Sequence, residues 1–209
     1  ASEEEGGDSR VIREPLPPAP DERGVRAIGL RKVYPRGVAV HSLHLEMRPG
    51  SISSLLGANG AGKTTTISML TGLVPPTSGT GIIDGWSISK PSEIATIRSA
   101  LGVCPQQNVL WDNLSASQHL NLYAALKGLH GKLLTPAVDD MLSQVGLSDR
   151  AHVNAASLSG GQKRKLCLAI ALIGKPSTLF LDEPTSGMDP SSRRNIWNLL
   201  RQTRIGRTV

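Results

Sequence analysis

The segment GANGAGKT, Gly57 to Thr64, contains residue types suited to holding phosphate groups, because it fits the pattern G-x-x-x-x-G-K-[ST]. Its glycines let the backbone curl so that amide N–H groups point at phosphate oxygens, and the helix predicted to follow adds its positive dipole end. Lys63 can reach the β- and γ-phosphates of a nucleotide, and the Thr64 hydroxyl can bind Mg²⁺. The residues expected to contact the nucleotide are Gly57, Asn59, Gly60, Ala61, Gly62, Lys63, Thr64 and Thr65. A glycine-rich turn that only caps a helix is the alternative, and the strand predicted before the loop argues against it.

Two adjacent carboxylates, Asp182 and Glu183, follow the apolar segment STLFL, which is predicted to be a buried strand. Asp182 is expected to hold Mg²⁺ through its water ligands. Glu183 is expected to act as the general base that polarises an attacking water, a role worth about 10²–10⁴-fold in rate. An acidic turn that caps a helix has the same sequence, so the phosphate-binding loop upstream is what indicates hydrolysis.

Gln106 and Tyr34 are further candidates. Gln106 follows the predicted strand LGVC. A neutral amide at this position can contact Mg²⁺ or the attacking water and sense the γ-phosphate. Considered alone, Gln106 fits better as a solvent-exposed loop residue. Tyr34 lies upstream of the loop, between Lys32 and Arg36, and can stack on adenine. Comparable stacking on bases is worth about 1–3 kcal/mol. Packing in the core is the alternative for Tyr34.

The elements that must position these residues alternate along the chain. Strands are predicted over 25–34, 43–57 with a Pro-Gly turn inside, 79–85, 101–106 and 177–184, and helices over 62–73, 91–101, 115–129, 136–147, 157–176 and 189–204. We expect Gly72 to close the first helix, and Asp189 or Ser191 to cap the last. The alternation predicts an α/β fold with a mostly parallel sheet, and the region of about 107–165 predicts an inserted helical subdomain.

Composition limits the class of protein. The net charge is +6, and residues 1–22 carry −5, so the remainder carries +11. A basic body suits an anionic ligand, nucleic acid, an anionic membrane face or simply a solvated surface.

Residues 1–24 are acidic and Pro-rich, and we expect a disordered linker. The longest apolar run, Leu166 to Ile173, is far shorter than the roughly 20 residues of a spanning helix. Cys104 and Cys167 lie in apolar stretches and are expected to be reduced core thiols, which suits an intracellular compartment.

The segment LSGGQ, Leu158 to Gln162, gives the chain its family resemblance. With it, the sequence resembles the nucleotide-binding domain of ABC transporters over roughly residues 25–209. The order of motifs agrees with that family throughout: an aromatic residue, the phosphate-binding loop, Gln106, LSGGQ, the two carboxylates, and SGMD ending at Asp189. The resemblance implies a P-loop NTPase core with an antiparallel β subdomain, ATP and Mg²⁺ as ligands, and ATP hydrolysis coupled to transport.

The resemblance also implies partners. In this family two domains pair head to tail, and the LSGGQ segment of one caps the ATP held by the other. Here that segment provides Ser159, Gly160, Gly161 and Gln162 as nucleotide-contacting residues, while Asp189 signals between the two sites. Transmembrane domains of the same or an associated chain receive the movement from the helical region and the Gln106 loop. The domain is expected on the cytoplasmic face of a membrane.

Several segments resemble the A subfamily, whose members mostly move lipids: GLVPPTSGT, LGVCPQQNVLWDNLS, DEPTSGMDPSSRRNIWNLL and GRTV. Two departures are Ala58, where many relatives have Pro or His, and Gln162, where A-subfamily domains often have Met. The family has a switch histidine a few residues after GRTV, beyond Val209, so we expect the chain to bind ATP but hydrolyse it poorly as it stands.

Two other functions compete with transport. A soluble ABC-type ATPase acting on nucleic acid or ribosomes would suit the basic body, but the coiled coils or tandem ATPase domains of such proteins are not visible in the sequence, and no nucleic acid is expected as a partner. A binding-only regulatory domain is disfavoured by the intact Lys63, Asp182 and Glu183.

Overall fold

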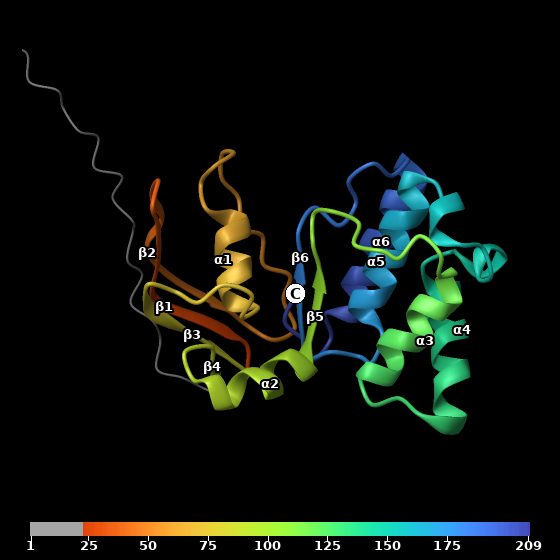
Figure 1. Ribbon diagram of the computed structural model, residues 1–209, viewed down its shortest axis with the longest axis horizontal. Helices are drawn as coiled ribbons and strands as arrows, with labels where there is room; N and C mark the ends of the chain where they lie inside the picture. Colours follow the sequence, from red (N-terminus) through yellow and green to blue (C-terminus); the bar gives the residue numbers. More distant parts are fainter. Residues whose placement is uncertain (1–22) are drawn as a thin grey trace, which may run out of the picture.

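The computed structural model describes residues 23–209 and contains two sheets and six α-helices within that range (Figure 1). The predicted acidic, Pro-rich linker falls almost entirely on residues 1–22, which lie outside the described residues. No helix within residues 23–209 is both long enough and apolar enough to cross a bilayer.

The antiparallel sheet has the strand order β2-β1-β3-β4. Its strands are β1 (Val25–Tyr34), β2 (Gly37–Met47), β3 (Ser78–Ile83) and β4 (Trp86–Ser87). Side chains alternate across the sheet, so Val25 and Ala27 of β1 are buried on one face. This sheet confirms the expected antiparallel β subdomain.

The parallel sheet consists of β5 (Leu101–Cys104) and β6 (Thr178–Leu181), with Cys104 opposite Leu181 at the carboxyl ends. Its two faces belong to two different cores. Leu101 and Phe180 pack with the antiparallel sheet, whereas Cys104 and Leu179 pack with the helices α3 to α6. The helix α5 approaches β5 so closely that a Cβ on Gly102 would lie 2.0 Å from the carbonyl oxygen of Ala171.

The strand expected before the phosphate-binding loop is not formed, so the prediction of strand structure over Ser51–Leu56 is wrong. Within residues 23–209, this segment pairs only with the segment 207–209, through bonds such as Ser53 N to Val209 O at 2.7 Å. Beyond Ser53 the described part of the chain provides no backbone partner for this segment, and Leu56 is 89% exposed. The α/β class is confirmed, but the parallel sheet is smaller than the expected mostly parallel one.

All six predicted helices are present. They are α1 (Lys63–Leu70), α2 (Pro91–Ala100), α3 (Ala116–Leu126), α4 (Leu134–Gln144), α5 (Gly160–Leu172) and α6 (Pro190–Thr203), joined in the helical region by the short 3₁₀ turns Gly131–Leu133, Ser148–Arg150 and Ala155–Ser157. In Figure 1, α1 lies between the antiparallel sheet and the β5–β6 pair, and α3 to α6 lie on the other side of that pair. Gly72 follows the end of α1 with φ 70°, as expected.

Asp189, and not Ser191, caps α6. Its Oδ1 accepts hydrogen bonds from the backbone N–H groups of Ser191 at 3.0 Å and Ser192 at 2.9 Å. The hydrogen bonds from the Ser191 hydroxyl and the Ser192 amide hold the pKa of the Asp189 carboxyl well below its ordinary value. The carboxylate therefore stays ionised and stabilises the helix terminus.

Candidate active site

The loop Gly57–Gly62 joins the exposed Leu56 to the first turn of α1. Gly62 is the N-cap of α1 in a left-handed conformation, φ 86°, and no side chain caps the helix. A Cβ at Gly62 would lie 2.4 Å from the carbonyl oxygen of Ala39 and 2.9 Å from the side chain of Val40. Only glycine fits there, because β2 lies directly behind the loop. The N-terminal amides of α1 are thus left for an anion.

Lys63 folds back onto this loop. Its Nζ donates hydrogen bonds to the carbonyl oxygens of Gly57 at 2.7 Å and Ala58 at 2.8 Å. Both acceptors are neutral, whereas a phosphate oxygen carries negative charge, so the attraction between opposite charges adds to the hydrogen bond with the ammonium group. A phosphate oxygen can therefore replace the carbonyl oxygens as the partner of the ammonium group. Before a nucleotide binds, the two hydrogen bonds from Lys63 hold the loop in its curled conformation.

Thr64 and Asp182 meet at the edge of this loop, although 118 positions separate them in the sequence. The Thr64 hydroxyl donates a hydrogen bond of 3.1 Å to the Asp182 carboxylate. Hydroxyl and carboxylate oxygens are the ligand types that Mg²⁺ accepts, alongside substrate phosphates and water. The residues therefore fit a magnesium ion, which would neutralise developing charge on the transferred phosphoryl group.

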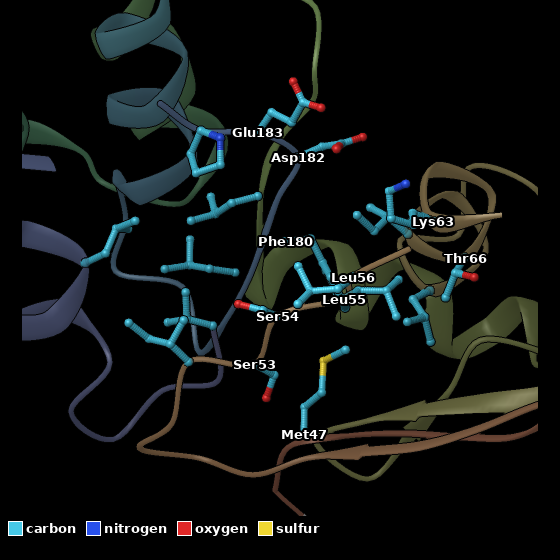
Figure 2. A pocket seen from close by; sticks show the side chains of 18 of the residues that line it. Met47, Ser53, Ser54, Leu55, Leu56, Lys63, Thr66, Phe180, Asp182 and Glu183 are labelled. Carbon is cyan, nitrogen blue, oxygen red and sulfur yellow. The ribbon is translucent and has the colours of Figure 1, made fainter. Parts of the chain in front are cut away.

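Glu183 follows with an unusual backbone, because its φ is 49°. A left-handed conformation costs about 1–3 kcal/mol for a residue other than glycine, and the surrounding structure must hold it. Figure 2 shows Asp182 and Glu183 at one end of a cleft, with Lys63 across from Asp182. The cleft has a volume of about 370 Å³ and an apolar floor that includes Met47, Ile67 and Phe180.

Gln106 lies at the same edge of the sheet as these carboxylates. The carboxyl ends of β5 and β6 are adjacent, with the Asp182 amide donating to the Cys104 carbonyl at 2.9 Å, and Gln106 comes two residues after β5. Parallel strands bring the residues after their carboxyl ends together, so the sequence-based grouping of Gln106 with the two carboxylates agrees with the topology.

Tyr34 lies apart from this group, at the end of β1 next to the turn into β2. Its side chain is 40% exposed, and the Lys32 ammonium is 5.2 Å from the ring centroid. The ring is therefore not a core residue. Its stacking on adenine stays a prediction.

The LSGGQ segment begins α5 with a reciprocal cap. The amide of Gln162 donates to the Ser159 hydroxyl at 3.3 Å, and the amide of Ser159 donates to the Gln162 side chain at 2.9 Å. Within residues 23–209 the amides of Gly160 and Gly161 have no backbone or side-chain acceptor, so they are free to bind an anion. Gly161 lies close to the SGMD segment, since a Cβ there would be 3.5 Å from the carbonyl oxygen of Gly187.

The helix starts at the phosphate-binding loop and at the LSGGQ segment face different neighbours. The helix α1 packs against β2 and β3, whereas α5 packs against β5 from the other side of the parallel pair (Figure 1). The LSGGQ segment therefore does not close over the phosphate-binding loop of its own chain.

Arg164 is a buried residue of this region that the sequence reasoning missed. Its guanidinium donates to backbone carbonyls at the ends of both β5 and β6. Arg164 is only 2% exposed, although it lies between two lysines. Helical spacing was the available signal, because Arg164 lies four residues before Leu168 and seven before Ala171, both buried.

Comparison with known proteins agrees with this architecture. Residues 40–186 match the ABC transporter family. The chain is 47% identical over 184 residues to ABC transporter A family member 2 of Dictyostelium discoideum, covering 86% of this chain and 11% of that protein. It is 48% identical over 190 residues to the phospholipid-transporting ATPase ABCA3 of Homo sapiens, covering 89% of this chain and 11% of that protein.

Solved structures give the same result. The ATP-binding cassette MJ0796, in a dimeric post-hydrolysis state bound to ADP and Pi, superposes with a TM-score of 0.80 at 26% identity, covering 86% of this chain and 82% of that chain. An ATP-binding subunit of an ABC transporter superposes with a TM-score of 0.79, also at 26% identity, covering 87% of this chain and 75% of that chain.

The fold and site are thus those of a P-loop ATPase domain that binds ATP. The chain belongs to the ABC transporter family, and the curated relatives named here are members of its A subfamily. The chain spans about a tenth of the length of these relatives.

Proposed function

We propose that this chain is the ATP-hydrolysing domain of an A-subfamily membrane transporter and that the transported substrate is a lipid. The observation that carries the proposal is the contact between Thr64 and Asp182, because it joins the phosphate-binding loop to the end of β6, where Glu183 follows. A lipid substrate is supported by the similarity to a phospholipid-transporting ATPase.

In this mechanism the triphosphate binds the curled amides of the loop, and Lys63 leaves the carbonyls of Gly57 and Ala58 for the β- and γ-phosphates. Thr64 and Asp182 would hold Mg²⁺, which would neutralise charge on the phosphate oxygens. Gln106 orients the attacking water from the neighbouring strand end, and Glu183 accepts its proton. The water oxygen bonds to the γ-phosphorus while the bond from that phosphorus to the β,γ-bridging oxygen breaks, and ADP is the leaving group. Tyr34 stacks on the adenine.

A second ATPase domain completes the site. Because the LSGGQ segment lies away from the loop of its own chain, Ser159, Gly160 and Gly161 are free to cap the ATP of a facing domain in a head-to-tail pair. The dimeric state of MJ0796 supports such pairing. ATP binding closes the pair, hydrolysis reopens it, and transmembrane domains receive the movement on the cytoplasmic side of the membrane.

The test uses the full-length protein reconstituted in phospholipid vesicles. We expect Lys63→Ala to lower both ATP affinity and lipid movement between leaflets, because the phosphates lose their cationic partner. The control is Lys132→Ala, which removes an equal charge from a 3₁₀ turn in the helical region. Lipid movement that is unaffected by Lys63→Ala would refute the proposal, and salt-sensitive RNA binding would favour the nucleic-acid alternative.

A further inference from the structure

Arg164 is a fully charged side chain inside the core of this domain. It lies in the second turn of α5 and is 2% exposed. Within residues 23–209 no carboxylate forms an ion pair with it. Burying a charge without an opposite charge is costly, so the hydrogen bonds that the guanidinium makes must offset this cost.

The guanidinium bridges two segments of the chain. Its Nη1 donates to the carbonyls of Pro105 and Gln106, the latter at 3.1 Å, and so binds the end of β5. Its Nη2 donates to the carbonyls of Asp182 and Glu183, the latter at 2.8 Å, and its Nε donates to Glu183 at 3.2 Å, so that both bind the end of β6. The planar fork of arginine supplies these directions at once, and a lysine cannot.

Three of the four bound carbonyls belong to residues with proposed roles in the chemistry: Gln106, Asp182 and Glu183. The peptide after Glu183 is held by two donors of Arg164, and this is the residue whose φ of 49° requires support from its surroundings. The same side chain holds the peptide after Gln106. Arg164 therefore fixes the backbone positions from which the Glu183 and Gln106 side chains extend, although its own hydrogen bonds reach only main-chain atoms.

We propose that Arg164 is a positioning residue for hydrolysis: it fixes Glu183 and Gln106 relative to each other and ties both to α5, the helix that begins at the LSGGQ segment. This inference rests on the proposed function. Misplacing catalytic groups by about 1 Å can cost about 10²-fold in rate. Substituting Arg164 is thus expected to lower kcat for ATP while leaving ATP binding nearly unchanged, because within residues 23–209 its hydrogen bonds go to residues 105–106 and 182–183 and not to the phosphate-binding loop.

The experiment measures steady-state ATPase kinetics and equilibrium ATP binding of the full-length protein. Lys63→Ala serves as the reference: the ATPase turnover that it abolishes is taken as the turnover of this domain. We expect Arg164→Met to lower the kcat of ATP hydrolysis by this domain about 10²-fold. The KM and the dissociation constant for ATP should stay within about threefold of those of the unsubstituted protein. The matched control is Lys163→Met, one residue away on α5. It removes the same charge, and the Lys163 side chain takes part in no salt bridge within residues 23–209. It is expected to leave kcat unchanged.

Arg164→Lys separates positioning from folding. It retains a buried positive charge and donors but offers a single nitrogen, which cannot serve both strand ends. We expect its kcat to be lowered together with that of Arg164→Met, at a normal dissociation constant for ATP. A folded Arg164→Lys protein with the original kcat would overturn the proposal. Loss of ATP affinity in parallel with kcat in both variants would also overturn it, because a purely structural role produces that result. If Lys63→Ala removes no turnover, the proposed function itself fails, independently of Arg164.

Discussion

The hydroxyl of Thr64 and the carboxylate of Asp182 are 3.1 Å apart in a domain where 118 positions of sequence separate them. One residue belongs to the first turn of α1 and the other comes directly after β6. Their contact closes the site across the two segments, and it provides the oxygen pair at which Mg²⁺ is expected.

Removing the Thr64 hydroxyl is expected to weaken magnesium binding selectively. Thr64→Val keeps the shape of the side chain but removes one metal ligand, so we expect about 10–100-fold more Mg²⁺ to be needed for half-maximal ATPase activity. Thr64→Ser keeps the hydroxyl and is the control, with an unchanged midpoint. A Mg²⁺ titration of ATP hydrolysis measures this, and equal midpoints for Val and Ser would contradict the assignment.

Glu183→Gln tests the general base. The amide keeps the size of the side chain but cannot accept the proton of the attacking water, so kcat is expected to fall by about 10²–10⁴-fold. ATP binding persists, and bound ATP should accumulate with the two domains held together. Single-turnover hydrolysis and size-exclusion chromatography with ATP measure both effects. Unchanged turnover would show that another group is the base.

Gly62→Ala is expected to disrupt the phosphate-binding loop. The new Cβ would enter a space where the Ala39 carbonyl lies 2.4 Å away, in addition to the strain of φ 86°. The strain alone costs about 1–3 kcal/mol, and the clash adds to it. Gly60→Ala is the matched control, because Gly60 has φ 83° but no atom within 4 Å of its Cβ position. We expect a lower melting temperature and weaker ATP binding for Gly62→Ala than for Gly60→Ala. The reverse order would be incompatible with the position of β2 behind the loop.

Cys104 is expected to resist alkylation in the folded protein. Burial raises its pKa from 9.0 to about 12, against the opposing effect of the Arg164 charge, while Cys167 and Asp182 raise it further. The unfolded chain loses the thiol proton near pH 9, whereas the folded chain keeps it up to about pH 12. The contribution of Cys104 to the free energy of unfolding is therefore fully present below pH 9 and is lost as the pH rises toward 12.

Iodoacetamide labelling followed by peptide mass spectrometry measures this protection. Labelling of Cys104 at pH 8 should require urea. Rapid labelling of the native protein at that pH would show that Cys104 is accessible as a thiolate, contrary to its burial.

Much of the local structure around the proposed site could be predicted from the sequence, because its signals are local. Three signals each depend only on residues of their own segment: the spacing of the glycines and Lys63, the apolar run before Asp182, and the Ser and Gln of LSGGQ. Turn geometry, strand burial and helix capping depend mainly on neighbours a few residues away. For the same reason the helices were found close to their observed bounds.

The tertiary structure decided what depends on distant partners. The segment 51–56 has strand-like composition, but a strand forms only where another backbone lies alongside, and within residues 23–209 its backbone bonds are made at Ser51 and Ser53 alone. The hydrogen bonds of the buried Arg164 likewise could not be deduced from the local run Lys-Arg-Lys, because their acceptors are carbonyls of residues 105–106 and 182–183. The sequence by itself determined which groups can bind phosphate, hold Mg²⁺ and accept a proton, since these are properties of residue types. Their distances and supporting contacts were decided only by packing, which joins segments far apart in the chain.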